Sequence, residues 1–374
     1  SRAFYELPPV LRSEDELNRA LLDLEQLILA AKGSPGGPVH INVPMEEPLY
    51  EKLPEAIFSG MELVQQSYPP VLDSLELKHM PVQKKILVLA GMGTYEDEIQ
   101  HLMKDLSSRR QFVLVAENIA NMRSELFIAN PELILAGASA HEREELKPGL
   151  IIAFGGQVVS KRLKQFVQKL SGAEVRVLEG DPLQAMEEIA ALEGNKEQTY
   201  TNNYLSVWKK IETREMARAS RFLESSPFCN LTAVGTILAA LPNNSVVHLG
   251  NSATIRNSQL MPVRQDLSYF SNRGTSGIDG SVSAAVGAAL VSEMLHVLLV
   301  GDLSFVYDSN ALWNRNFPAN LKLIVLNDSG GGIFRLLEGP DRMAFFEEYS
   351  VTHHPVSLEL LSQSFGRRYM RVSN

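Results

Sequence analysis

His296-Val-Leu-Leu-Val-Gly-Asp302 and Leu321-Lys-Leu-Ile-Val-Leu-Asn-Asp-Ser-Gly330 are the two stretches that decide the fold of this chain. Each begins with a short apolar run, rich in valine, isoleucine and leucine, which is typical of an interior strand of a parallel sheet. Each ends in acidic residues and glycine. Neighbouring parallel strands end at the same edge of a sheet, so we expect the two acidic loops to meet there, where open α/β sheets collect their ligands.

The acidic residues at these strand ends predict a site for a hard divalent cation. Mg²⁺ prefers near-octahedral oxygen ligands and shares them with phosphate oxygens. Asp302 and Asp328 can each give a carboxylate oxygen, and Gly330 can give a carbonyl oxygen. The alternative is that Asp302 caps a helix and Asn327-Asp-Ser-Gly330 is only a turn. Both halves follow an apolar run, which favours the metal site.

The order of elements along the 374 residues predicts an α/β fold with two parallel-sheet domains, preceded by a remnant of a third. Residues 1–80 would be the tail of an amino-terminal domain and a linker. Residues 81–192 would form a central α/β domain, and residues 193–374 a ligand-binding domain that stops early. The expected strands of the two domains are Ile86–Ala90, Phe112–Ala116, Leu150–Phe154, Glu174–Leu178, Val246–Leu249 and the two runs above.

The composition excludes several classes of protein. A net charge of −9 argues against a general nucleic-acid binder. Ser281–Val300 is long and mostly apolar, but it contains Glu293 and divides into a helix and a strand, so no membrane segment is expected. Cys229 is the only cysteine and is expected to be buried on a helix. The default is a soluble cytoplasmic protein.

Two glycine-containing loops carry further candidate residues. Ser271-Asn-Arg-Gly-Thr-Ser-Gly-Ile-Asp-Gly280 allows a ligand to approach the backbone closely, and its Arg273 can donate to a carboxylate or phosphate. Gly250-Asn-Ser-Ala-Thr-Ile-Arg256 follows a predicted strand and places Ser252 near the arginine, one helical turn away. The structural alternatives are a strand-to-helix turn for the first loop and a capped helix start with an exposed arginine for the second.

Two more stretches can contribute to a pocket. Gly330-Gly-Gly-Ile-Phe334 places Ile333 and Phe334 just past the predicted metal loop, where they either line a pocket or belong to the core. Ser160-Lys161-Arg162 places paired cations after another strand. These cations can meet an acidic substrate, although an exposed helix start is the explanation that the sequence favours.

The motifs together resemble the metal–diphosphate signature of thiamine diphosphate enzymes, with Gly301-Asp302 followed by Asn327-Asp328-x-Gly330. Within that superfamily, the chain is similar to the MenD family of menaquinone biosynthesis. Three segments carry this likeness, and Ser-Gly-Ile-Asp-Gly280 is the most telling part of them. They are Gly250-Asn-Ser-x-x-x-Arg256, Ser271–Gly280 and Gly-Gly-Ile-Phe334.

The resemblance implies an activity and a set of ligands. The expected reaction is decarboxylation of 2-oxoglutarate and addition of the succinyl unit to isochorismate, with thiamine diphosphate and Mg²⁺ or Mn²⁺ as cofactors. Both substrates are dicarboxylates, so a cluster of cations suits them. The full-length protein would be a homodimer or homotetramer with active sites shared between chains.

The resemblance also implies a role for each candidate residue. Asp302, Asp328 and the Gly330 carbonyl would bind the metal, and Ile278 would hold the cofactor in its bent shape. The remaining cofactor-binding residues would be Gly301, Leu303, Ser304 and Asn327. The residues that receive substrate carboxylates or line the pocket would be Ser252, Arg256, Arg273, Lys161, Arg162, Ile333 and Phe334.

The chain departs from the family pattern in two ways. The second metal position is often asparagine in the family, whereas here it is Asp328, which leaves Asn327 as another possible ligand. The family's pyrimidine-binding domain, with the glutamate that activates the cofactor, would precede Ser1. We therefore expect this chain to show no turnover by itself.

Two other functions stay open at this point. One is a different 2-oxo-acid decarboxylase or carboligase of the same superfamily, such as an acetolactate synthase. The other is a non-catalytic α/β module that binds a phosphorylated ligand.

Overall fold

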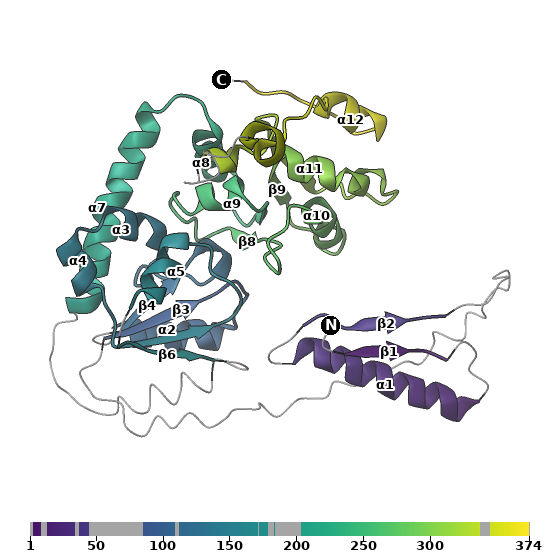
Figure 1. Ribbon diagram of the computed structural model, residues 1–374, viewed down its shortest axis with the longest axis horizontal. Coiled ribbons are helices and arrows are strands. Elements are labelled where there is room, and N and C mark those ends of the chain that lie inside the picture. Colours follow the sequence, from purple (N-terminus) through teal and green to yellow (C-terminus); the bar gives the residue numbers. More distant parts are fainter. Residues whose placement is uncertain are drawn as a thin grey trace. The chain divides into compact units, whose positions relative to one another are not determined.

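The computed structural model describes residues 3–8, 13–33, 37–44, 85–108, 112–170, 172–178, 183, 203–336 and 345–373 (Figure 1). The chain divides into two compact units. The first comprises Ser1–Lys78 and Leu178–Ala185, and the second comprises His79–Val177 and Met186–Asn374. The predicted linker, residues 45–80, lies outside the described residues.

The first unit contains a helix and a parallel pair of strands. β1 (Phe4–Glu6) pairs with β2 (His40–Asn42), and α1 (Glu14–Lys32) connects them. Ser13 caps α1, because its hydroxyl accepts a hydrogen bond of 3.2 Å from the amide of Glu16. β1 was not predicted from the sequence.

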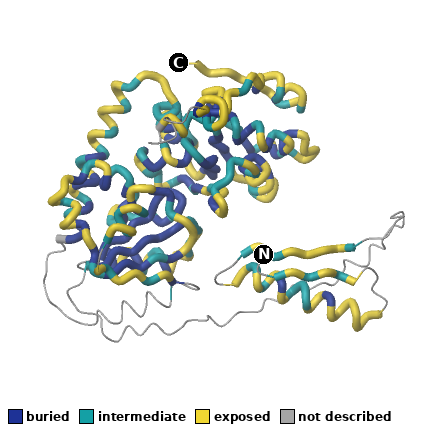
Figure 2. The backbone as a smooth tube through the Cα atoms, viewed as in Figure 1, coloured by how far each residue is buried: buried dark blue, intermediate teal, exposed yellow. Residues whose placement is uncertain are grey.

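The second unit holds two four-stranded sheets in which every strand pair is parallel, and this confirms the predicted fold class. The central sheet has the strand order β4-β3-β5-β6. Its strands β3 and β4 are apolar and buried along their whole length, as Figure 2 shows. The elements of this part are β3 (Ile86–Ala90), α2 (Asp97–Ser108), β4 (Phe112–Ala116), η2 (Asn118–Ala120), α3 (Pro131–Gly137), α4 (Ala140–Glu145), β5 (Leu150–Phe154), α5 (Lys161–Gln168) and β6 (Glu174–Val177).

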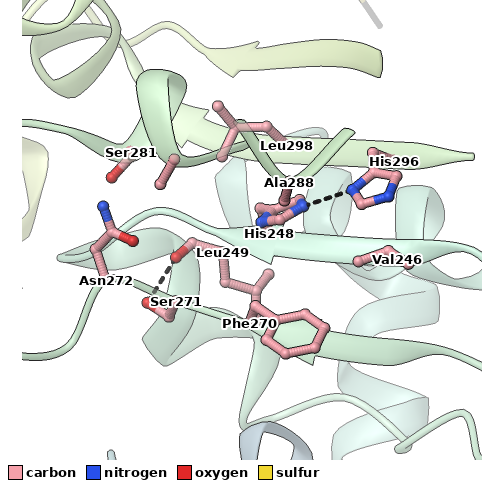
Figure 3. A pocket seen from close by; sticks show the side chains of 11 residues that line it. Val246, His248, Leu249, Phe270, Ser271, Asn272, Ser281, Ala288, His296 and Leu298 are labelled. Carbon is pink, nitrogen blue, oxygen red and sulfur yellow. Dashed lines mark hydrogen bonds between the residues drawn. The ribbon is translucent and has the colours of Figure 1, made fainter. Parts of the chain in front are cut away.

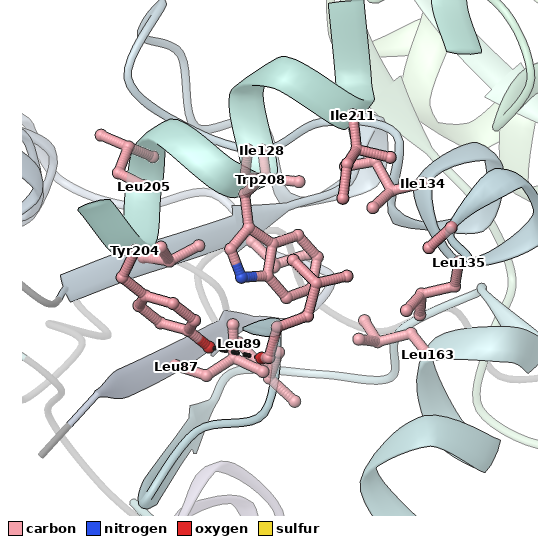
Figure 4. Close-up of a cluster of buried hydrophobic side chains, with 14 of the residues drawn as sticks. Leu87, Leu89, Ile128, Ile134, Leu135, Leu163, Tyr204, Leu205, Trp208 and Ile211 are labelled. Atoms are coloured by element: carbon pink, nitrogen blue, oxygen red, sulfur yellow. Dashed lines mark hydrogen bonds between the residues drawn. The ribbon is translucent and has the colours of Figure 1, made fainter. Parts of the chain in front are cut away.

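The long helix α7 (Asn203–Ser225) packs onto the central sheet. Its Trp208 is fully buried among leucines and isoleucines of the sheet and of α3 (Figure 4). The Phe166 ring of α5 meets the Trp208 ring edge-on, with 6.5 Å between ring centroids. The predicted boundary near residue 193 stays a prediction, since residues 184–202 lie outside the described ranges.

The second sheet has the strand order β10-β9-β7-β8. β9 and β10 are neighbours, and Gly301 pairs with Leu326 at their carboxyl ends, as the sequence predicts. The elements of this part are α8 (Asn230–Ala240), β7 (Val246–Leu249), α9 (Ala253–Ser258), β8 (Ser268–Phe270), α10 (Ser281–Leu290), β9 (His296–Gly301), α11 (Asp302–Tyr307), η3 (Ser309–Trp313), β10 (Leu321–Leu326), η4 (Gly332–Leu336), the π-helix η6 (Phe346–Val351) and α12 (Leu358–Ser364).

Two local expectations need correction. The apolar run His296–Val300 was predicted to be a strand, and the helix before it was expected to fill Ser281–Leu295; the helix instead ends at Leu290, and a turn precedes β9. Cys229 is exposed at the position before α8, where its amide donates to the Thr232 hydroxyl at 2.9 Å. The prediction of a buried cysteine was therefore wrong, because the residue lies in the helix cap and not on the apolar face. Within the described ranges, no helix is both long and apolar enough to cross a membrane.

Candidate functional site

The carboxyl ends of β9 and β10 bring the two acidic loops into direct contact. The amide of Gly330 donates a hydrogen bond of 3.0 Å to Oδ2 of Asp302. Asp302 begins α11 directly after β9 and is only 1% exposed. Its other oxygen, Oδ1, accepts from the amide of Leu303 at 2.7 Å. A buried carboxylate held by backbone donors keeps a fixed direction.

His354 adds a further group at this carboxylate. Its Nε2 lies 3.3 Å from Oδ2 of Asp302, and the side chain is 11% exposed. Both ring nitrogens are buried and make no hydrogen bond. The segment after η6 places the ring there, because the amide of His354 reaches the carbonyl of Ser329 at 3.4 Å. No motif in the sequence indicates this histidine, since its position depends on the path of that segment.

Asp328 lies across the loop from Asp302. Its Oδ2 accepts a hydrogen bond of 3.2 Å from the side-chain amide of Asn230. Partial burial and the negative charge of Asp302 raise the pKa of Asp328 above its ordinary value. The side chain of Asn327 instead accepts from the amide of Ser329 at 3.1 Å, within its own turn. The side-chain oxygen of Asn327 is thus used within its turn, whereas only one of the two carboxylate oxygens of Asp328 accepts the hydrogen bond from Asn230. Asp328 is therefore the more available of the two candidates for the second metal position.

The donor set fits a magnesium ion that holds a diphosphate. Two carboxylates and a backbone carbonyl are hard oxygen ligands, and Mg²⁺ completes its shell with water or phosphate oxygens. A methyl group added at Gly332 would lie 2.2 Å from Oδ2 of Asp328, so this glycine leaves the space that the carboxylate uses. Among the described residues, no cluster of three or more histidine, cysteine or acidic side chains is suited to hold a metal.

Asn251 joins the two glycine-containing loops. Its side-chain amide donates to the carbonyl of Asn272 at 2.6 Å and to that of Gly277 at 2.7 Å. Ile278, next in the chain, is partly buried, and its carbonyl accepts from the hydroxyl of Ser304 on α11. The predicted cofactor residues of the glycine loop and of the metal loop thus belong to one connected network.

Ser252 occupies an unusual backbone conformation at the start of α9. Its φ is +73° and its ψ is −126°, in a region that residues with a side chain rarely adopt. Such a conformation costs on the order of 1–3 kcal/mol and is often found at binding sites. The hydroxyl makes no capping hydrogen bond with α9. The serine therefore does not act as the simple helix cap that was the structural alternative.

Arg273 is a buried cation with an unused donor. The residue is 9% exposed, its Nη1 donates to Oδ1 of Asn251 at 3.1 Å, and its Nε has no hydrogen-bond partner. Burial lowers the pKa of Arg273, and the positive charge of Arg256 lowers it further. Arg256 itself is exposed. The two arginines proposed to receive carboxylates therefore act on one another at the same edge of the sheet.

Lys161 and Arg162, the paired cations predicted to meet a substrate, lie at the start of α5. Arg162 pairs with Glu132 at 3.0 Å, and Lys161 is exposed at the start of α5. Lys164, one turn further on, is the residue of α5 whose pKa the charges of Arg273 and Arg256 lower, after the effect of burial. The role predicted for Lys161 and Arg162 stays a prediction.

The two predicted pocket residues after the metal loop lie on η4. Ile333 is partly buried and Phe334 is 37% exposed. The amide of Gly331 donates to the carbonyl of Val351 at 2.5 Å, so η6 packs against this loop. Ile333 and Phe334 follow the proposed metal ligands closely in the sequence. Both side chains are partly exposed, so a bound ligand can contact them.

A separate cavity of about 400 Å³ lies beside β7, β8 and α10 (Figure 3). His248 and His296 stack at its floor, with 2.9 Å between Nε2 of His248 and Nδ1 of His296. Burial lowers the pKa of His248 to about 4, and His296 contributes to this shift. At the opposite end the cavity reaches Ser271 and Asn272, the first residues of the arginine-containing loop.

Comparison with known proteins agrees with this geometry. Residues 250–374 match the family described as thiamine pyrophosphate enzyme, C-terminal TPP binding domain. Those residues include all the metal and glycine loops above. The class of protein that fold and site define is therefore that of the thiamine diphosphate enzymes.

Individual relatives narrow the class further, and each is named 2-succinyl-5-enolpyruvyl-6-hydroxy-3-cyclohexene-1-carboxylate synthase. The protein of Desulfotalea psychrophila is 32% identical, over 98% of this chain and 70% of the relative. That of Flavobacterium psychrophilum is 34% identical, over 90% of this chain and 64% of the relative. That of Bacteroides fragilis is 30% identical, over 99% of this chain and 68% of the relative.

The chain belongs to this synthase family, which is the MenD family that the motifs resemble. It spans about two thirds of the length of these relatives.

Proposed function

We propose that this chain is part of an enzyme that decarboxylates 2-oxoglutarate and adds the succinyl unit to isochorismate, in menaquinone biosynthesis. The proposal includes Mg²⁺, or Mn²⁺, as the ion that bridges the protein and thiamine diphosphate. The observation that carries it is the contact between the amide of Gly330 and the carboxylate of Asp302. This contact joins the two halves of the metal loop at the ligand-binding edge of the sheet.

Each group of residues has a part in the proposed site. Thiamine diphosphate, when bound, supplies the carbanion chemistry. Asp302, Asp328 and the Gly330 carbonyl would hold the metal, and Ile278 would press on the cofactor. Arg273 and Arg256 would bind substrate carboxylates, because guanidinium groups pair with carboxylates in bidentate fashion. The proposed supporting residues are Gly301, Leu303, Ser304, Asn327, Ser252, Lys161, Arg162, Ile333 and Phe334.

Calorimetry with the full-length protein tests this function. Thiamine diphosphate should bind in the presence of Mg²⁺ and much more weakly when the metal is chelated, because the diphosphate then lacks its bridge. Absence of any metal-dependent binding would leave only the non-catalytic module. Donor preference tests the substrates: 2-oxoglutarate should be used in preference to pyruvate, and the reverse order would favour an acetolactate synthase-like activity.

The assembly and location proposed for the whole protein rest on the family resemblance and on the sequence. We propose a homodimer or homotetramer in the cytoplasm. Light scattering of the full-length protein measures its mass in solution, and a monomer would contradict the proposed assembly.

A further inference from the structure

Arg256, Arg273 and Lys164 form a positively charged cluster where the central sheet meets the glycine loops. The side-chain amide of Gln157 donates to the carbonyl of Gly274 at 2.9 Å, next to Arg273. The side-chain amide of Asn118 donates to the hydroxyl of Ser258 at 3.1 Å, on the helix that carries Arg256. The carboxylate of Glu117, next to Asn118, also accepts from the amides of Val159 and Ser160 directly before α5. The start of α5, one turn before Lys164, is therefore linked through η2 to the helix that carries Arg256.

Among the described residues, Glu117 is the carboxylate whose charge acts on this cluster, and its hydrogen bonds go elsewhere. Glu117 is 1% exposed, and its two oxygens accept from the amides of Val159 and Ser160 at 2.5 and 2.7 Å. Its charge acts on both Lys164 and Arg273. Glu132, the next acidic group, is neutralised by Arg162. Three cations against one carboxylate leave a surplus of two positive charges when all four groups are ionised.

The surplus points to an anionic ligand. Like charges in a partly buried place repel one another, and burial disfavours each of them unless an anion is near. Arg273 is nine-tenths buried, and its Nε has no hydrogen-bond partner, so a donor is available for that anion. The size of the surplus matches a ligand with two carboxylates.

We propose that Lys164 binds a substrate carboxylate together with Arg256 and Arg273, and so sets the preference for dicarboxylates. This inference rests on the proposed function for the identity of the ligand. The structure assigns the role to Lys164 because Arg162 is paired with Glu132, whereas Lys164 is half-buried and has no salt bridge among the described residues.

Binding of unreactive dicarboxylates to the full-length protein tests the role of Lys164. Glutarate keeps both carboxylates of the donor substrate and lacks its reactive carbonyl; chorismate is an isomer of the acceptor with the same two carboxylates. Pentanoate is the monocarboxylate control for glutarate. Lys164→Gln should weaken glutarate or chorismate at least tenfold, leave pentanoate within about twofold, and reduce the salt dependence of the affected ligand. The ligand that loses affinity identifies the substrate that Lys164 contacts.

Matched variants separate charge from folding. Lys169→Gln removes the same charge from the exposed end of the same helix and should change no affinity by more than about twofold. Lys164→Arg keeps the charge and should retain most of the affinity. Circular dichroism and unchanged binding of thiamine diphosphate verify the fold of each variant.

The outcomes distinguish this inference from the proposed function. Unchanged affinity of Lys164→Gln for both dicarboxylates, with normal cofactor binding, overturns the role of Lys164 and leaves the function standing. An equal loss of dicarboxylate affinity in Lys164→Gln and Lys169→Gln also overturns the role of Lys164. Failure of the unaltered protein to bind thiamine diphosphate with Mg²⁺ would refute the function, while the dicarboxylate measurements still test the cluster.

Discussion

The amide of Gly330 donates to Oδ2 of Asp302 at 3.0 Å, although 28 positions separate the two residues in the chain. The contact exists because β9 and β10 are parallel neighbours that end in register. The loop that contains Asp328 and Gly330, two of the proposed metal ligands, is thus held by one backbone hydrogen bond to Asp302, the third. Changes that disturb either strand end should affect metal-dependent binding before they affect the fold.

Gly332→Ala is expected to displace a metal ligand without unfolding the protein. The new methyl group would lie 2.2 Å from Oδ2 of Asp328 and push this short side chain aside. We expect the Mg²⁺-dependent affinity for thiamine diphosphate to fall about tenfold, with the unfolding midpoint nearly unchanged, as measured by calorimetry and urea titration. Gly287→Ala is the control, since nothing lies within 4 Å of its added methyl group. Equal affinity in the two variants would contradict the position of Asp328.

Ser252 should limit the stability of the protein. Glycine tolerates a φ of +73°, whereas alanine does not. The unfolding free energy of Ser252→Gly should therefore be higher than that of Ser252→Ala by about 1 kcal/mol. Both variants lose the hydroxyl and should be equally weakened in glutarate binding. Urea denaturation and calorimetry measure the two effects. Alanine being as stable as glycine would show that the backbone strain is not real.

His248 should make stability depend on pH. Its pKa is about 4 in the folded protein and ordinarily 6.5, so the unfolded chain takes up the proton first as the pH falls. The unfolding free energy therefore decreases between pH 6.5 and 4, by up to about 3 kcal/mol, and this contribution is constant outside that window.

The variant His248→Gln isolates this effect from other acidic groups. Glutamine can keep a polar contact with His296 but does not titrate, so the loss of unfolding free energy from pH 7 to pH 4.5 should be smaller than in the unaltered protein. Urea titrations at the two pH values measure it. An identical loss in both proteins would show that His248 is not the titrating group.

Trp208 should be essential to the fold of the central part. It is fully buried in the cluster of Figure 4, and replacing a large buried aromatic by alanine costs about 3–5 kcal/mol. Trp208→Ala should therefore lower the urea midpoint strongly, whereas Phe222→Ala, at a 61% exposed position of the same helix, should change it little. Similar midpoints for the two variants would contradict the packing of α7.

The sequence was sufficient for much of the fold, because apolar runs report directly on buried parallel strands. β3, β4, β5 and β7 begin and end at the predicted residues. β8 escaped prediction, since Ser268–Phe270 is too short to show a pattern. β1 was missed for the same reason.

The site was predictable only in part. The apolar runs placed Asp302 and Gly330 at the same edge of one sheet, because parallel strand ends meet there. Arg273 follows β8, which was not predicted, so its position at that sheet is known only from the structure. Lys164 and His354 could not be found from motifs. Lys164 lies on α5, and the position of this helix near the arginines depends on the loop contacts of Gln157 and Glu117. His354 reaches Asp302 through the path of the segment after η6.

The most direct test of the central claim is calorimetric titration of thiamine diphosphate into the full-length protein and its Asp302→Ala variant, with Mg²⁺ and with chelator. We predict that Mg²⁺ strengthens binding at least a hundredfold in the unaltered protein and has almost no effect in the variant. An equal effect of Mg²⁺ in both proteins, with both folded, would show that Asp302 does not hold the metal.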